Sequence, residues 1–280
     1  MSNTLKFIKM EGLGNDFIVM HNVLHDSIQP IIKHCVKLCN RRLGIGADGL
    51  IFILPSKKAD FNMRIFNSDG NEAEMCGNGI RCCSLYVKSM QLSDKQLLNF
   101  ETGAGIISTQ FIENDLIRVT MSKPILESTR IPTIKKSCKV IMHDLQVDCK
   151  LFKITAVSMG NPHAVIYADE LSDDLVTIWG AKIEKHPFFP NRTNVEFVKV
   201  LSNNEIQMRV WERGCGETLC CGTGACASVV SGIINNLHGN KVTVHLPGGD
   251  LLVEWDGKET SPVFMTGPAK IAFRGNVDID

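Results

Sequence analysis

The sequence predicts an α+β protein made of two pseudo-symmetric repeats, each a barrel-like wrap of strands around one buried central helix. Two observations predict this fold. First, one motif occurs twice: a glutamate four residues before Cys-Gly-x-Gly stands at Glu72–Gly79 and again at Glu217–Gly224. Second, each copy leads into a helix-like segment that is flanked by many short strand-like runs.

The repeat extends well beyond the cysteine motif. Its aligned segments are 145 or 146 residues apart, and a single loop insertion would explain the difference. The aligned pairs are Cys76 with Cys221 (221 − 76 = 145), Met63 with Met208 (208 − 63 = 145), Gly14 with Gly160 (160 − 14 = 146), and 48–52 with 194–198 (194 − 48 = 146). We therefore expect two copies of one unit within the 280 residues.

The composition favours a small-molecule partner. Hydrophobic residues make up 44% of the chain, which is ordinary for a protein with a sizeable core. The formal net charge is zero, so the charge balance predicts no nucleic acid and no anionic membrane as partner. No apolar run approaches the roughly 18 residues that a membrane-spanning helix needs.

The eleven cysteines predict reduced thiols. The number is odd, and the first residues lead into a strand-like run with no secretory signal, so we expect a cytoplasmic protein. No Cys-x-x-Cys pair is present, and we expect no metal site. Most of the cysteines are expected to be small buried hydrophobic residues, namely Cys35, Cys39, Cys82, Cys83, Cys138, Cys149, Cys220 and Cys226.

Apolar periodicity and turn residues predict the elements of the first half. A glycine-rich turn at 12–16 separates two strands, and the spacing of Ile31, Cys35 and Leu38 is typical of a helix. We expect strands at 7–10, 17–23, 50–54 and 61–66, helices at 28–40 and 78–90, and a hairpin of 100–111 with 116–121. The two prolines of the segment 124–132, which has no periodicity, predict a boundary between the halves.

The second half repeats this plan. Its helix, predicted at 223–236, is rich in glycine, alanine and serine, which suits a helix enclosed closely by strands. We expect strands at 151–158, 164–168, 195–201, 205–211, 242–245, 251–255 and 270–273.

A cysteine at a helix N-terminus lies beside unsatisfied backbone N–H groups and the positive end of the helix dipole. This environment usually lowers the thiol pKa. The amides of the neighbouring glycines can bind a carboxylate. We expect this chemistry at both Cys76 and Cys221.

Two such sites predict inversion of a stereocentre. If the halves pack about a pseudo-two-fold axis, both thiols face an interdomain cleft, with a substrate α-carbon between them. One thiolate removes the α-proton from one face, and the other thiol delivers a proton to the opposite face. The alternative is that both cysteines are structural remnants of a duplicated packing motif.

The halves differ where the two thiols would need to be distinguished. Phe17 of the first half is replaced by His163, and Asn67 by Glu212, so this histidine and glutamate are candidates for controlling thiol protonation. Arg213 is a candidate carboxylate clamp. Asn15, Asn67, Asn161 and Asn194 carry amides that can bind both an ammonium and a carboxylate group.

Seven segments together resemble the diaminopimelate epimerases: 12–17, 66–70, 76–82, Gly160–His163, 192–196, 212–214 and 221–224. They cover nearly the whole chain. The resemblance implies a homodimeric, cofactor-independent enzyme that interconverts LL- and meso-2,6-diaminopimelate on the bacterial route to lysine and peptidoglycan. It also implies two domains, residues 1–121 with a returning C-terminal strand at 268–280, and residues 122–267.

The resemblance also implies roles for individual residues. Cys76 and Cys221 would be the acid and base, with His163 and Glu212 tuning them. Gly77, Asn78, Gly222 and Thr223 would hold the reacting carboxylate, and Asn15 would contact the reacting end. The distal end of the substrate would be bound by Asn67, Asn161, Asn194, Glu212 and Arg213.

Two departures from the family pattern stand out. Many members carry glutamine where this chain has Gly49, so no side-chain contact is assigned there. Cys220 precedes Cys221 directly, but the Gly-x-Gly register and the repeat select Cys221 as the acting thiol.

Two other functions stay open. One is a related isomerase for proline, hydroxyproline or an aromatic metabolite, although Arg213 and the asparagines favour a substrate with a second zwitterionic end. The other is a binding module or redox sensor whose functional state is a Cys76–Cys221 disulfide. We find no P-loop, dinucleotide fingerprint or pyridoxal-lysine motif, and we expect no cofactor.

Overall fold

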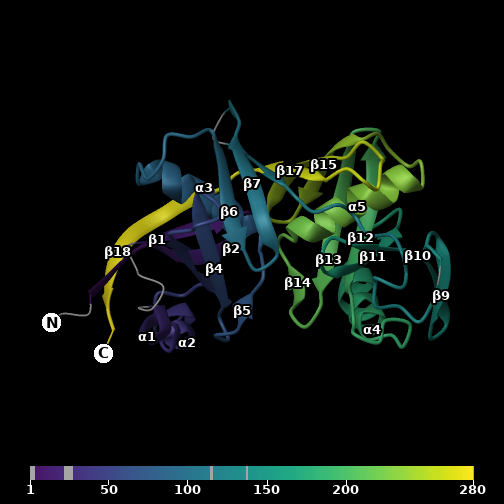
Figure 1. Cartoon of the computed structure of the whole chain (residues 1–280). Coiled ribbons are helices and arrows are strands. Elements are labelled where there is room, and N and C mark those ends of the chain that lie inside the picture. Colours follow the sequence, from purple (N-terminus) through teal and green to yellow (C-terminus); the bar gives the residue numbers. More distant parts are fainter. Residues whose placement is uncertain (1–3, 22–27, 114–115, 137, 280) are drawn as a thin grey trace. The chain divides into compact units, whose positions relative to one another are not determined.

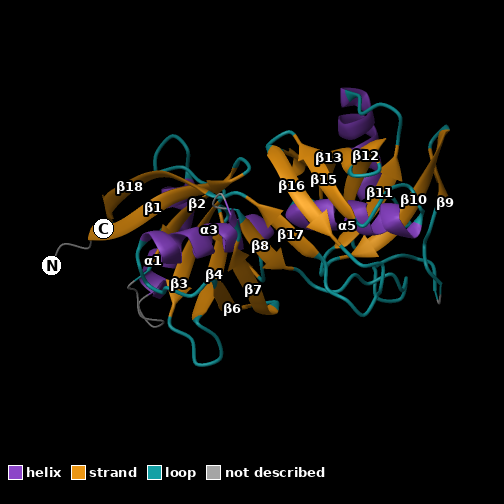
Figure 2. Cartoon of the chain, turned by 90° about the horizontal axis from the view of Figure 1, so that it is seen from above, coloured by secondary structure: helices purple, strands orange, loops and turns teal. Residues whose placement is uncertain are grey.

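The computed structural model describes residues 4–21, 28–113, 116–136 and 138–279. The chain divides into two compact units, Met1–Val119 with Gly267–Asp280, and Thr120–Thr266. The predicted class is confirmed: each unit is rich in strands and has one long helix, which lies among the strands of its own unit (Figures 1 and 2).

The first unit is a curved sheet in the order β18-β1-β2-β3-β4-β6-β7-β8. Its strands are β1 (Thr4–Gly12), β2 (Asn15–Met20), β3 (Gly49–Leu54), β4 (Phe61–Asn67), β5 (Glu72–Ala73), β6 (Leu97–Thr102), β7 (Gly105–Phe111), β8 (Ile117–Thr120) and β18 (Lys270–Asp278). Its helices are α1 (Ile28–Ile32), α2 (Cys35–Cys39) and α3 (Gly77–Ser89). The C-terminal strand β18 runs antiparallel to β1, as Figure 1 shows in yellow beside purple.

The second unit has the same plan, in the order β9-β10-β11-β12-β13-β15-β16-β17. Its strands are β9 (His143–Val147), β10 (Lys150–Ser158), β11 (Pro162–Tyr167), β12 (Asn194–Ser202), β13 (Glu205–Glu212), β14 (Gly216–Thr218), β15 (Lys241–Leu246), β16 (Gly249–Glu254) and β17 (Phe264–Gly267). Its helices are the π-helix η3 (Leu175–Trp179), α4 (Gly180–Glu184) and α5 (Gly222–Ile234).

Strand pairing fixes the register of the repeat. Phe17 of β2 pairs with Gly49 of β3, and His163 of β11 pairs with Asn194 of β12. The counterpart of Asn194 is therefore Gly49 (194 − 49 = 145) and not Asp48, so the predicted alignment of 48–52 with 194–198 is wrong by one residue. Because side chains alternate across a strand, this shift decides which residues share a face.

Most positions of the two long helices are small or apolar, which suits their enclosure by strands. In α3 the buried residues include Ile80, Cys82, Cys83 and Val87, with Asn78 and Arg81 as polar exceptions, and α5 consists of glycine, alanine, serine, valine and isoleucine with one threonine and one cysteine. The strands of each unit contact its own helix. Each helix begins directly after a cysteine, so the fold of each unit fixes the position of its thiol.

Several local predictions need correction. The helix predicted at 28–40 is two short helices, because the chain makes a tighter turn at His34, whose N–H bonds to Ile31 O. The segment 100–111 is not one strand but the end of β6, a turn, and β7, although β7 does pair with the next strand. The strand predicted at 17–23 ends at Met20, and positions 22–23 lie outside the described residues. Cys138 and Cys149 are exposed, not buried.

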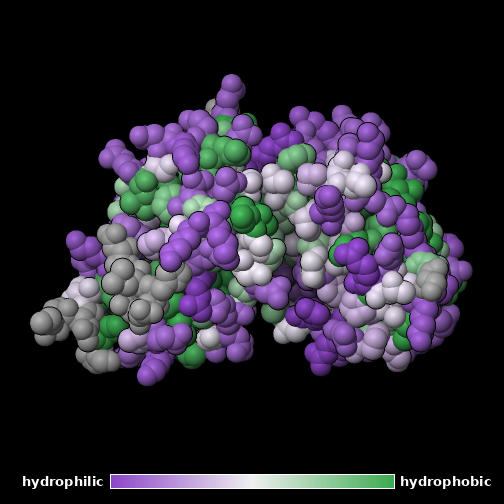
Figure 3. Space-filling view, viewed as in Figure 1, coloured by the Kyte–Doolittle hydropathy of each residue, from purple (hydrophilic) through white to green (hydrophobic). Residues whose placement is uncertain are grey.

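Most of the face drawn in Figure 3 is polar, and its hydrophobic residues form small separate patches. Within the described ranges, none of the helices has both the length and the apolar character needed to cross a membrane.

Candidate active site

The first half-site is built on Cys76, the N-cap residue of α3. Its sulfur accepts a hydrogen bond from Gly79 N at 3.5 Å. The Cys76 thiol lies 3.6 Å from Asn15 Oδ1, which also accepts from Asn78 Nδ2 at 3.2 Å. The side chain of Cys76 is partly exposed and therefore accessible to a small molecule. The structure thus brings three of the predicted residues, Cys76, Asn15 and Asn78, together.

Charged residues fix the orientation of Asn15. Its Nδ2 donates to Asp48 Oδ2 at 2.7 Å, which leaves Oδ1 directed at the thiol. Arg41 bonds to both Asp48 and Asp16, and Asp16 also lies 2.6 Å from the Lys9 ammonium. Burial of Asp16 by itself would raise its pKa, but the hydrogen bonds from Arg41 and Lys9 outweigh it and hold the pKa well below the usual range.

Arg81 stabilises the first turn of α3 by hydrogen bonds to it. This residue was assigned no role from the sequence. Its guanidinium is fully buried and donates to Gly77 O at 3.1 Å, Asn78 Oδ1 at 3.0 Å and Pro268 O at 3.0 Å. These bonds hold the Gly77–Asn78 segment, whose amides are the predicted carboxylate site. An arginine within a helix that sequence patterning marks as buried is the signal that could have identified it.

The second half-site is built on Cys221, the N-cap residue of α5. Its sulfur accepts from Gly224 N at 3.3 Å and lies 3.5 Å from Thr223 Oγ1. Thr223 in turn accepts from Asn161 Nδ2 at 3.2 Å, and Asn161 Oδ1 lies 3.0 Å from His163 Nε2. Four predicted residues, Cys221, Thr223, Asn161 and His163, therefore form one hydrogen-bonded chain.

The prediction that helix N-termini lower the thiol pKa is wrong for Cys221. Burial raises its pKa well above the usual range, and the Glu212 and Glu196 carboxylates raise it further, against the opposing hydrogen bonds of Thr223 and Gly224. Burial likewise raises the pKa of Glu212, which accepts hydrogen bonds from Thr218 and from the Cys221 thiol. At this half-site desolvation and negative charge outweigh the helix dipole, and Cys221 rests as a thiol.

Glu212→Gln should lower the pKa of Cys221, because it removes a carboxylate whose charge disfavours the thiolate. Iodoacetamide reacts with thiolates, so alkylation of Cys221, followed by peptide mass spectrometry, should reach its half-maximal rate at a lower pH than in the wild type. Glu217→Gln is a control, since Glu217 is exposed and paired with Arg209 at 2.7 Å. An unchanged or higher midpoint in Glu212→Gln would contradict the electrostatic explanation.

The remaining predicted residues lie at strand ends of their own units. Asn194 is buried, and its amide is occupied by backbone: Nδ2 donates to Pro162 O and Oδ1 accepts from Arg213 N, both at 2.9 Å. It therefore fixes the loop that carries Arg213, whose guanidinium is exposed. Asn67 is exposed at the end of β4.

Sequence analysis missed Glu196. Its Oε1 lies 2.7 Å from His163 Nδ1, and both side chains are completely buried. The predicted alignment of 48–52 with 194–198 matched Glu196 with Leu50, whereas strand pairing matches it with Ile51; either way a glutamate replaces an apolar residue of the other repeat. A glutamate in an otherwise apolar strand segment was the available signal.

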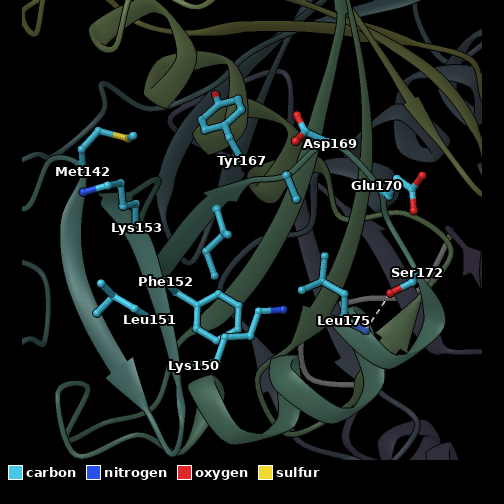
Figure 4. Close-up of a pocket in the computed structure, with 12 residues that line it drawn as sticks. Met142, Lys150, Leu151, Phe152, Lys153, Tyr167, Asp169, Glu170, Ser172 and Leu175 are labelled. Carbon is cyan, nitrogen blue, oxygen red and sulfur yellow. Dashed lines mark hydrogen bonds between the residues drawn. The ribbon is translucent and has the colours of Figure 1, made fainter.

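A separate pocket of about 530 Å³ lies in the second unit, beside β10 and β11 (Figure 4). Its lining includes Lys150, Phe152, Lys153 and Glu170, and the Lys150 ammonium lies over the Phe152 ring, 5.1 Å from its centroid. None of the predicted site residues lines it. In the described part of the chain, no three His, Cys, Asp or Glu side chains cluster in a way that could hold a metal ion.

Comparison with known proteins decides the family. The model of the family described as diaminopimelate epimerase matches residues 7–127 and 155–272. The chain belongs to the diaminopimelate epimerase family. The prediction that it is an enzyme of this family, an isomerase, is thereby confirmed.

Relatives and solved structures agree with this membership. The diaminopimelate epimerase of Carboxydothermus hydrogenoformans is 49% identical, with 97% of this chain and 98% of the relative covered. That of Halothermothrix orenii is 48% identical, with 98% of each covered. The crystal structure of a hydroxyproline epimerase from Agrobacterium vitis superposes with a TM-score of 0.72 at 13% identity, covering 100% of this chain and 94% of that one. At so low an identity the last match shows a shared fold alone.

Proposed function

We propose that this protein is a cofactor-independent epimerase that interconverts LL- and meso-2,6-diaminopimelate, with Cys76 and Cys221 as its two acid–base residues. The observation that carries the proposal is the equivalence of the two thiols: each is the N-cap of the one long helix of its unit, and each sulfur accepts from the glycine N–H three residues later. Two equivalent proton carriers are what inversion at a single α-carbon requires.

The thiols have different resting roles. Cys221 is buried beside carboxylates and rests protonated, so it supplies the proton that the carbanion receives. Cys76 is partly exposed and takes the α-proton as a thiolate. In the reverse direction the roles exchange. His163 and Glu212 control the protonation of Cys221, which they reach through Asn161 and Thr223 and by a direct hydrogen bond.

The substrate would be held by amides and one guanidinium. The N–H groups at the start of each helix, at Gly77–Asn78 and Gly222–Thr223, bind the reacting carboxylate, since such groups lack intrahelical acceptors. Exposed Arg213 binds the distal carboxylate in bidentate fashion. The amide-bearing residues Asn15, Asn67, Asn161 and Asn194, together with Glu212, complete the contacts to the amino and carboxylate groups.

Two-base chemistry of this kind needs neither a metal nor pyridoxal phosphate. We place the enzyme in the cytoplasm, on the route to lysine and peptidoglycan precursors, where its eleven cysteines would stay reduced. We also propose a homodimer. Light scattering should then give about twice the 31.0 kDa of one chain.

Substrate choice tests the proposal against the other isomerases of this fold. Reduced protein should epimerise LL-diaminopimelate without added cofactor and leave L-proline and hydroxyproline unchanged. Oxidising the thiols should stop turnover, and reductant should restore it, because a disulfide or sulfenic acid cannot carry the proton. Turnover of proline alone would contradict the proposed substrate. Binding that appears only in the oxidised protein would favour the redox-sensor alternative.

A further inference from the structure

The two units differ at a buried pair of side chains on adjacent strands. The first unit has Phe17 and Ile51 on adjacent strands, at most 2% exposed. At the same positions of β11 and β12 the second unit has His163 and Glu196, both 0% exposed and 2.7 Å apart. Burying two ionisable groups is costly compared with an apolar pair of similar size. The first unit adopts the same fold with the apolar pair Phe17 and Ile51. The fold of the second unit therefore does not require the ionisable pair His163 and Glu196.

The hydrogen bonds of the ring define its protonation. His163 Nδ1 faces a carboxylate oxygen, and Nε2 faces Asn161 Oδ1 at 3.0 Å. Asn161 Oδ1 is an acceptor, and so is Glu196 Oε1 when that side chain is a carboxylate; with both as acceptors, each ring nitrogen donates a hydrogen bond, as in an imidazolium.

The donors then follow one another toward Cys221. Asn161 uses its Oδ1 for the ring and its Nδ2 for Thr223 Oγ1, at 3.2 Å. The Thr223 hydroxyl, with its oxygen occupied by that donor, is free to direct its hydrogen at the Cys221 sulfur 3.5 Å away. This series of hydrogen bonds thus starts at the His163 ring and ends at the sulfur that becomes negative when Cys221 gives up its proton.

The Glu196 carboxylate packs against the backbone of Gly224, where a larger residue would clash with it. A Cβ at Gly224 would lie 2.8 Å from Glu196 Oε1, just as a Cβ at Gly79 would lie 3.0 Å from Ile51 Cδ1. In each unit, the absence of a Cβ at the glycine of the first helical turn therefore leaves room for the side chain from the adjacent strand, Ile51 or Glu196. Within the described residues Glu196 Oε2 has no hydrogen-bond partner, so the His163 ring is the group that compensates its charge.

We propose that Glu196 is a positioning residue for the acid–base chemistry: its carboxylate keeps His163 as an imidazolium whose Nε2–H orients Asn161 and Thr223, so that their donors stabilise the Cys221 thiolate. This inference rests on the proposed two-base function. By this inference, the second unit has Glu196 where the first has Ile51 because of the acid–base chemistry and not because of packing.

Glu196→Gln tests the charge while keeping the shape. The Glu196 carboxylate by itself raises the pKa of Cys221, but its loss also removes the imidazolium charge and the donors which that charge orients. We expect the second effect to dominate and kcat to fall by about tenfold to a hundredfold in both directions. KM should stay within about twofold, since no substrate contact is removed. ¹⁵N NMR of histidine-labelled protein should show imidazolium resonances for His163 at pH 7.5 in the wild type and neutral-ring resonances in Glu196→Gln.

Two further variants separate charge from folding. Glu196→Asp keeps the carboxylate. This variant should show the imidazolium resonances and should retain most of the kcat that is lost in Glu196→Gln. The double variant His163→Phe/Glu196→Ile installs the pair of the first unit, and should fold with an unchanged Tm but lose kcat. The proposal is overturned by a neutral His163 ring in the wild type, by wild-type kcat in Glu196→Gln or in the double variant, or by equal losses in Asp and Gln. If instead Cys76→Ala or Cys221→Ala retains turnover, the proposed function itself fails.

Discussion

Cys76→Ala and Cys221→Ala should each abolish epimerisation in both directions, with kcat reduced by about ten-thousand-fold or more, while the protein stays folded. In the proposed two-base reaction each thiol is the base in one direction and the acid in the other, so losing either one should stop the complete reaction. Both side chains lie at helix N-caps, where alanine removes the contact from sulfur to a glycine N–H at 3.3–3.5 Å and the contact to Asn15 or Thr223 but leaves the helix itself in place. Turnover from each stereoisomer, together with circular dichroism, checks this.

Two matched controls accompany these variants. Cys220→Ala removes the thiol next to Cys221, and Cys138→Ala removes an exposed one. Both should keep turnover, because neither residue caps α3 or α5. Loss of activity in Cys220→Ala with full activity in Cys221→Ala would show that Cys220, and not Cys221, is the acid–base residue of the second unit.

Asp16→Asn should lower the free energy of unfolding by about 3 kcal/mol at neutral pH, since it leaves the Lys9 ammonium, which is 8% exposed, without its carboxylate at 2.6 Å. The folded-state pKa of Asp16 is depressed, so its stabilisation is fully present above the unfolded pKa of about 3.9 and disappears as pH falls through the folded pKa. The difference between wild type and variant should therefore shrink below about pH 4.

Urea unfolding at several pH values measures this effect. Asp144→Asn is the control, because Asp144 pairs with Lys153 at 2.8 Å on the surface, where such pairs contribute little. A loss in Asp16→Asn that does not depend on pH would show that the ion pair is not its origin. Activity should fall as well, since Asp16 shares Arg41 with Asp48, which orients Asn15.

The repeat made most of the fold predictable. Aligning two copies of a motif located both long helices to within about two residues, because each begins at a cysteine and continues with small or apolar residues. Short elements were harder to predict. The strands at β5 and β14 have two or three residues and no periodicity of their own, and helix 28–40 keeps an apolar face across the break at His34.

The helix-start position of each cysteine was predictable from the sequence, but the electrostatic environment of each thiol was not. Sequence placed each cysteine at a helix start, and local dipole arguments then predicted lowered thiol pKa values. Such local arguments could not reveal that Cys221 is buried near two carboxylates. These carboxylates come from other elements, Glu196 from β12 and Glu212 from the end of β13. Electrostatics of this kind depends on contacts that are distant in sequence.

Solvent exchange at the α-carbon tests the two-base account most directly. Reduced protein is incubated with LL-diaminopimelate in heavy water without added cofactor, and products are followed by NMR and chiral chromatography. The account predicts meso-diaminopimelate carrying one solvent deuteron at the inverted carbon, with little deuterium in the LL isomer at early times, because opposite thiols remove and deliver the proton. Deuterium appearing in recovered LL-diaminopimelate as fast as in the meso product would indicate a single base, and no exchange at all by folded, reduced protein would contradict the proposed substrate.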